Sequence, residues 1–102
     1  MFNLGDKVLI NRVDRYETFY KGQQYYLNNR VKEVKTNSKK DYFKSSVEGS
    51  QIYTVSASFD RYGDIGQTKC DCAAYAKYPG DCKHVVALLS FLKPIKKIYK
   101  NP

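Results

Sequence analysis

The sequence predicts an α+β domain with a helical N-terminal segment, an antiparallel sheet of about four strands, and a strand-to-helix corner before a buried C-terminal helix. Three observations support this order. Residues recur at helical spacing up to about residue 29, the period changes to two from Arg30, and an almost wholly apolar stretch follows residue 84. At 102 residues the chain has the length of one domain, and we treat residues 1–102 as a single unit.

Residues 1–29 are expected to form a helical lead-in. A first helix is predicted over residues 3–11, and Asp14 is a suitable N-cap for a second. The periodic residues of the second helix are Tyr16, Phe19, Tyr20, Gln23, Tyr26 and Leu27. Gly22 costs about 1 kcal/mol relative to Ala inside a helix, so it indicates close packing or a break. The pair at 28–29, both asparagine, is expected to end the helix.

Residues 30–69 are expected to form the antiparallel sheet. The four strands are predicted at 30–36, 41–47, 53–59 and 65–69, with turns at 37–40, 48–50 and 61–64. The central pair is the clearest, because two sets of alternating residues match across a hairpin: Phe43, Ser45 and Val47, then Tyr53, Val55, Ala57 and Phe59. The meander therefore delivers residues 70–72 at its last strand.

The stretch after residue 82 predicts a buried helix. Gly80 and Asp81 offer a turn and an N-cap, and the following residues are apolar around most of the helix. Phe91 is expected in the core with Phe19, Tyr26, Tyr53 and Phe59. Pro94 limits the helix, and residues 94–102 form a basic tail or linker.

One motif uses every cysteine and the sole histidine: Cys70-x-Cys72, nine residues, then Cys82-x-His84. Strand residues i and i+2 share a face about 6.5–7 Å apart, so a strand end can bring two sulfurs to one ion at about 2.3 Å each. Helix residues i and i+2 lie about 200° apart. Cys82 is therefore expected where the helix begins and His84 in its first turn. The pattern predicts one structural Zn²⁺ in residues 70–93.

Other interpretations of these four residues are weaker. Buried cysteines can be small core fillers, but chance rarely gives this spacing. Cys82 and His84 do not form an evident nucleophile–base pair, since no third group orients the imidazole. A catalytic zinc keeps an open position, whereas three cysteines and one histidine complete a tetrahedron.

The motif resembles the SWIM zinc finger, found in Swi/Snf-type ATPases, Mutator-class transposases and ubiquitin-ligase-like proteins. The resemblance extends to Phe19-Tyr20-Lys21-Gly22-Gln23-Gln24-Tyr25-Tyr26, Asn29-Arg30-Val31, Val47-Glu48-Gly49-Ser50 and Tyr53-Thr54-Val55, as in bacterial members. It implies Zn²⁺ bound by Cys70, Cys72, Cys82 and His84. It also implies DNA or protein partners and an accessory role in a larger ATPase, of which this chain would be a fragment.

The charge favours an anionic partner. The chain has 18 Lys and Arg against 10 Asp and Glu, for a formal +8, and three thiolates with one Zn²⁺ lower it by one, to about +7. Nucleic acid, DNA first, is the expected partner. The predicted contacts are Arg30, Lys32, Lys35, Lys39, Lys40, Lys83, Lys93, Lys96, Lys97 and Lys100. The alternatives are a solvated surface and a disordered or linking tail.

A protein-interaction or regulatory module is the second hypothesis. Ten tyrosines and five phenylalanines are many for this length. The tyrosines next to turns or between the ligand pairs are the interface candidates: Tyr42, Tyr62, Tyr75 and Tyr78. These tyrosines could equally stack on bases.

We expect no enzyme activity, because the acidic residues Asp14, Glu17, Glu33, Glu48, Asp60 and Asp64 show no convergent pair. No small-molecule substrate is expected. No apolar run approaches the roughly 18–20 residues of a membrane span. The odd cysteine count and the lack of a secretory h-region predict a reducing, cytoplasmic, bacterial setting.

Overall fold

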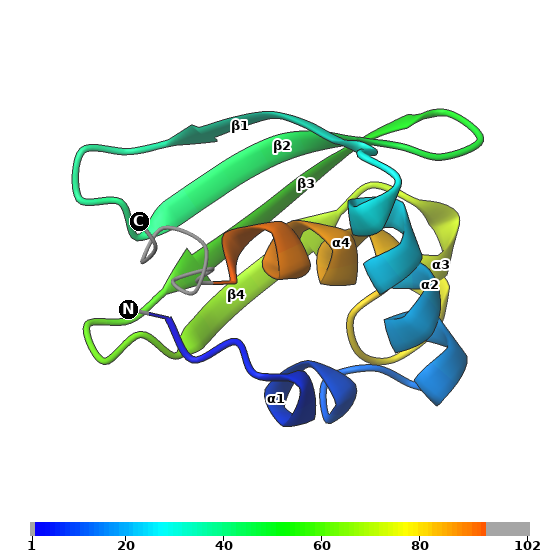
Figure 1. Ribbon diagram of the computed structural model, residues 1–102, viewed down its shortest axis with the longest axis horizontal. Helices are drawn as coiled ribbons and strands as arrows, with labels where there is room; N and C mark the ends of the chain where they lie inside the picture. The colour runs from blue at the N-terminus through cyan, green and yellow to red at the C-terminus, as the bar shows by residue number, and fades with distance from the viewer. Residues whose placement is uncertain (1, 94–102) are drawn as a thin grey trace, which may run out of the picture.

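The fold is that of a computed structural model, which describes residues 2–93. In this range two helices precede a four-stranded sheet and two follow it (Figure 1). The elements are α1 (Asp6–Ile10), α2 (Tyr16–Leu27), β1 (Val31–Thr36), β2 (Tyr42–Glu48), β3 (Ile52–Phe59), β4 (Ile65–Cys70), α3 (Ala73–Lys77) and α4 (Lys83–Leu92). The α+β prediction is confirmed. Across the same residues, no helix combines the length and apolar character needed to cross a bilayer.

The sheet is an antiparallel meander in the order β1-β2-β3-β4. The predicted central hairpin is confirmed in its register, with Val47 opposite Tyr53 and Ser45 opposite Val55. A bulge interrupts the pairing of β1 with β2 between Lys32 and Lys35, and Glu33 within it has a positive φ of 52°. The alternating pattern works as a predictor here because one face of each strand is buried.

Helix α4 forms the centre of the core. It packs against one face of the sheet, and α2 packs against α4 from the other side (Figure 1). Residues 85–89 of α4 are all at most 1 % exposed, which confirms the predicted buried helix. Gly22 of α2 lies against Val86, so close packing rather than a break explains this glycine. The opposite face of the sheet has no helix packed on it within residues 2–93.

Two predicted N-caps are wrong. Helix α2 begins after Arg15, so Asp14 lies one residue too early to cap it. Helix α4 begins after Cys82, and the carboxylate of Asp81 is held instead by Arg12 and Thr68. In both cases the alternative capping residue follows the predicted one by a single position.

Three other details differ from expectation. Helix α1 covers only Asp6–Ile10, and the short helix α3 between the two ligand pairs was not predicted. Phe91 is 41 % exposed rather than buried, because it faces away from the sheet and meets the edge of Tyr26 at a ring-centroid distance of 6.3 Å. An apolar residue in an all-apolar helix gives no sign of which side it occupies.

Candidate metal centre and basic surface

Three elements bring the predicted metal ligands together. Cys70 is the last residue of β4, Cys72 caps the start of α3, and Cys82 caps the start of α4, with His84 in the first turn of α4. The ligand atoms all lie within 4.8 Å of one another. His84 Nδ1 lies 3.8 Å from the sulfur of Cys70 and 3.9 Å from that of Cys82.

This arrangement fits a tetrahedral zinc ion. Zn–S bonds of about 2.3 Å and Zn–N bonds of about 2.0 Å place neighbouring ligand atoms about 3.5–3.8 Å apart, close to the two S···N distances. The donor set is three thiols and one imidazole, and all four residues are buried. A closed set of soft, buried donors is typical of a structural zinc site.

Residues 53–93 match the family model of the SWIM zinc finger. This SWIM region runs from β3 through α4 and contains all four ligands. Together with the geometry, the match confirms the prediction of one zinc site. The resemblance seen upstream, from Phe19 to the start of β3, lies outside the matched residues. Comparisons with curated proteins and with solved structures found no match.

The thiols of the SWIM region differ in acidity. A hydrogen bond donated by the Cys70 thiol lowers the pKa of Cys82 to about 4, against the opposing effect of burial. The same bond, with burial, raises the pKa of Cys70. Burial raises the pKa of Cys72. Without metal the site therefore holds one thiolate and two thiols, and zinc must displace two protons.

Two tyrosines hold the imidazole of His84. Its ring stacks on Tyr53 at a centroid distance of 4.3 Å and meets the edge of Tyr25 at 5.4 Å. Nε2 is buried with no hydrogen-bond partner among the described residues. With Nδ1 toward the metal, ring packing replaces the polar second-shell partner that usually orients a ligand histidine. The sequence pattern missed this role of Tyr25, because only the register of β3 against α4 reveals it.

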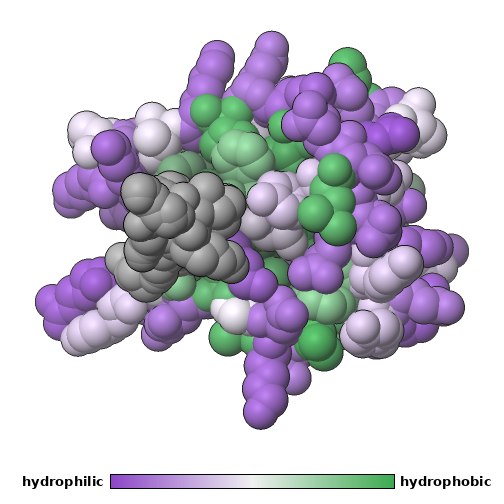
Figure 2. All heavy atoms as spheres, viewed as in Figure 1, coloured by the Kyte–Doolittle hydropathy of each residue, from purple (hydrophilic) through white to green (hydrophobic). Residues whose placement is uncertain are grey.

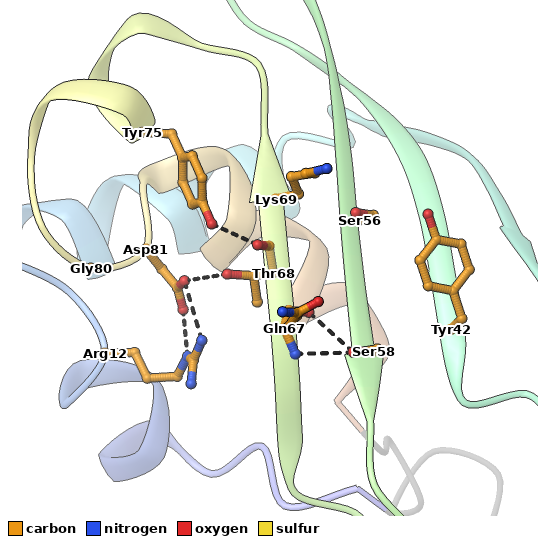
Figure 3. Close-up of a pocket in the computed structure, with 10 residues that line it drawn as sticks. All are labelled: Arg12, Tyr42, Ser56, Ser58, Gln67, Thr68, Lys69, Tyr75, Gly80 and Asp81. Atoms are coloured by element: carbon orange, nitrogen blue, oxygen red, sulfur yellow. Dashed lines mark hydrogen bonds and ion pairs between the residues drawn. The ribbon is translucent and has the colours of Figure 1, made fainter.

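An ion pair fixes the loop before Cys82. Asp81 is 5 % exposed, Arg12 Nε lies 2.6 Å from its Oδ2, and Thr68 Oγ1 donates to Oδ1 at 2.7 Å (Figure 3). The backbone N–H of Asp81 also donates to the carbonyl of Arg12 at 2.7 Å. A Cβ on Gly80 would lie 2.5 Å from that carbonyl, and Gly80 has a φ of +85° that favours glycine. These residues, distant in sequence, position the second ligand pair.

The predicted nucleic-acid contacts do not form one cluster. Arg30 and Lys83 converge on the ring of Tyr25, at 5.7 and 5.6 Å from its centroid. Lys32 and Lys35 flank the bulge of β1, and Lys39 and Lys40 occupy the turn beyond its other end. Lys93 pairs with Asp6 at 2.6 Å, so its charge is partly compensated. Lys96, Lys97 and Lys100 lie outside the described residues.

Two lysines that sequence reasoning passed over lie on the open face of the sheet. Lys44 of β2 and Lys69 of β4 are both exposed, and each belongs to the strand residues that alternate with the buried set. Their alternation was visible in the sequence. Their alignment with Lys35 across the sheet was not, because it depends on strand register.

The interface tyrosines have different fates. Tyr42, Tyr62 and Tyr78 are exposed, as expected. Tyr75 is half-buried, and its hydroxyl donates to the carbonyl of Thr68 at 2.6 Å. Tyr75 therefore braces the loop between the ligand pairs against β4.

Proposed function

We propose that this chain is a zinc-stabilised module that binds nucleic acid, with DNA as the first candidate. The observation that carries the proposal is uncompensated positive charge. Within residues 2–93 the three ion pairs occupy Arg12, Arg15 and Lys93, so the other described basic residues have no carboxylate at ion-pair distance. A net charge of about +7 with zinc bound favours a polyanion.

Zinc has a structural role in this proposal. The ligands Cys70, Cys72, Cys82 and His84 would hold the ion, which supplies four bonds that join the end of β4 to the starts of α3 and α4. All four are buried, so the nucleic acid does not reach the metal. The contacts come instead from the basic surface that the corner supports.

The resemblance to Swi/Snf-type proteins favours an accessory role in a larger ATPase. The sequence contains no G-x-x-x-x-G-K-[ST] phosphate loop, so ATP hydrolysis would be supplied by other segments of such an enzyme. Fusion to a motor domain would let this module hold the substrate while the motor acts on it.

Fluorescence anisotropy with the zinc-loaded chain tests the proposal. Labelled single-stranded and duplex oligonucleotides are titrated at about 50 mM and about 200 mM salt. Binding that weakens steeply with salt is expected, since phosphate contacts release counterions. The absence of binding to either oligonucleotide at about 50 mM salt would sink the proposal.

A protein-interaction module is the second candidate function. Helix α2 exposes Tyr16, Tyr20 and Leu27, which are 62, 54 and 68 % accessible. Figure 2 shows the helical side of the molecule, where hydrophobic residues form separate patches among hydrophilic ones. Separate patches favour a small interface over a large obligate one. A pull-down with the adjoining domains after nuclease treatment tests this candidate, and recovery of partners only with intact nucleic acid would count against it.

A further inference from the structure

A row of lysines crosses the open face of the sheet. The register places Lys35 opposite Lys44, Lys44 opposite Ser56, and Ser56 opposite Lys69. Residues paired directly across neighbouring strands share a face, and strands lie about 4.8 Å apart, so the row spans roughly 14 Å. The residues on either side of Lys44 in β2 that face α4 are half-buried or buried, which places the lysine row on the side away from that helix.

The same face carries little negative charge. The outward positions of β2 are Tyr42, Lys44, Ser46 and Glu48, so its one acidic residue lies at the end of the strand far from Tyr42. The outward positions of β3 and β4 that continue the row are serines, a threonine and a glutamine, besides Lys69. Hydroxyl and amide groups beside lysines suit a polar, anionic ligand.

A groove adjoins the lysine row. It has a volume of about 710 Å³, and its strand residues include Tyr42, Ser56, Ser58, Gln67 and Lys69. In Figure 3 the rings of Tyr42 and Tyr75 stand on opposite sides of the part of the groove built from β3 and β4. Tyr42 is 42 % exposed, so one face of an aromatic ring is accessible two residues from Lys44 on the same side of the strand.

We propose that this open face binds a single strand of nucleic acid, with Lys35, Lys44 and Lys69 on the phosphates and Tyr42 stacked on a base. This inference rests on the proposed function and assigns it a surface and a substrate form. Lysines in a line follow a phosphate backbone, while an accessible ring beside them needs an unpaired base. The stacking partner distinguishes a single strand from a duplex, whose bases present no free face.

The shape of the surface agrees with this choice. A helix or a two-stranded ribbon enters the major groove of duplex DNA, whereas the open face consists of four strands side by side (Figure 1). Sheet faces that bear aromatics and basic residues are suited to splayed bases. Lys69 directly precedes the zinc ligand Cys70, so the metal corner also holds one end of the lysine row in place.

The test compares charge removal on the two sides of the domain. Lys44→Gln/Lys69→Gln removes two charges from the open face, and Lys7→Gln/Lys21→Gln removes two from exposed positions of α1 and α2. With labelled single strands of about 20 nucleotides, DNA and RNA, the first pair should lower affinity at least about tenfold and reduce the salt slope by about 1.4. The second pair should change affinity less than about threefold.

Tyr42 provides an independent arm. Tyr42→Leu should lower single-strand affinity roughly tenfold, and Tyr42→Phe should keep it, because the ring and not the hydroxyl stacks. All variants are exposed substitutions, and unchanged zinc content and melting temperature confirm that they fold. DNA and RNA strands both support the inference, and their ratio identifies the source of the ligand.

The outcomes separate this inference from the proposed function. If the unmodified chain binds no nucleic acid, the proposed function fails and this inference fails with it. If it binds, but the two double variants lose affinity equally, or Tyr42→Leu binds normally, or duplex binds as tightly as single strands, the open-face assignment is wrong while nucleic-acid binding stands.

Discussion

A Cβ atom built on Gly22 would lie 2.4 Å from Cβ of Val86. Helices α2 and α4 therefore approach each other as closely as a missing side chain allows. The carbonyl of Lys83 in the first turn of α4 is also only 2.8 Å from that position. The contact joins the N-terminal lead-in to the helix that carries two zinc ligands.

Gly22→Ala should therefore destabilise the domain. In an exposed helix this change stabilises by about 1 kcal/mol, but here overpacking against Val86 should lower the free energy of unfolding by about 1–3 kcal/mol. Denaturant unfolding of the zinc-loaded protein measures it. Lys21→Ala, one residue earlier and exposed, is the control and should stay within about 0.5 kcal/mol. A stabilised Gly22→Ala protein would contradict the close packing.

Removal of zinc should unfold at least the segment from Cys70 to Leu92. Metal binding free energy is largely folding free energy in small sites, and α4 is both the ligand-bearing helix and the core of the domain. Cys72→Ser and His84→Ala should each lower the melting temperature by more than about 12 °C, from a loss of about 3 kcal/mol or more. Elemental analysis should give one zinc per chain. A chelated protein that keeps its melting temperature would refute a structural role.

Zinc uptake should release about two protons near neutral pH if the metal-free site keeps its geometry. Cys82 already has a pKa of about 4, while the pKa values of Cys70 and Cys72 are raised, so only the latter two must lose protons. Calorimetric titration in buffers of different ionisation enthalpy counts them. About three protons would show instead that the metal-free site is unfolded, with all three thiols at ordinary pKa values.

The stability of the metal-free fold should depend on pH in both directions. The pKa of Cys82 falls on folding from 9.0 to about 4, so its contribution is complete above pH 9 and is lost as the pH falls toward 4. The pKa values of Cys70 and Cys72 rise on folding, so their contribution is present below pH 9 and is lost above it. Urea midpoints across pH in the presence of a chelator measure both limbs. Cys82→Ser should flatten the acid limb.

Ring packing on His84 should contribute to zinc affinity. Tyr53→Ala removes the ring stacked 4.3 Å from the imidazole and should weaken zinc binding roughly tenfold or more, as loss of an orienting neighbour does. Tyr53→Phe keeps the ring and loses only the surface contact of the hydroxyl with Ser50, so its affinity should stay within about twofold. Competition with a chromogenic chelator measures both. Equal affinities for the two variants would mean that the ring does not position the ligand.

The Arg12–Asp81 pair should stabilise the loop before Cys82. Arg12→Ala leaves a buried carboxylate with only Thr68 as a side-chain partner and should cost about 1–3 kcal/mol in unfolding free energy. In an Asp81→Asn background the same substitution should cost less, because the neutral amide needs no counter-charge. A double-mutant cycle measures the coupling. Strict additivity would show that the two side chains act independently.

The sequence by itself determined the elements and the metal ligands. Strand alternation, the apolar run after residue 84 and the two Cys/His pairs are local patterns, and local geometry decides what they form. The central hairpin, with Val47 opposite Tyr53, and the position of Cys82 at a helix start were predictable for that reason. A glycine inside a helix likewise indicated close packing before its partner was known.

Only the tertiary structure decided what lies next to what. The line from Lys35 through Lys44 to Lys69 depends on register across three strand pairs, and a shift of one residue would move each side chain to the other face. The capture of Asp81 by Arg12, the stacking of Tyr53 on His84 and the exposure of Phe91 are contacts between residues distant in the chain. Such contacts arise when helices and sheet compete to bury the same apolar surface, and no local pattern records the result.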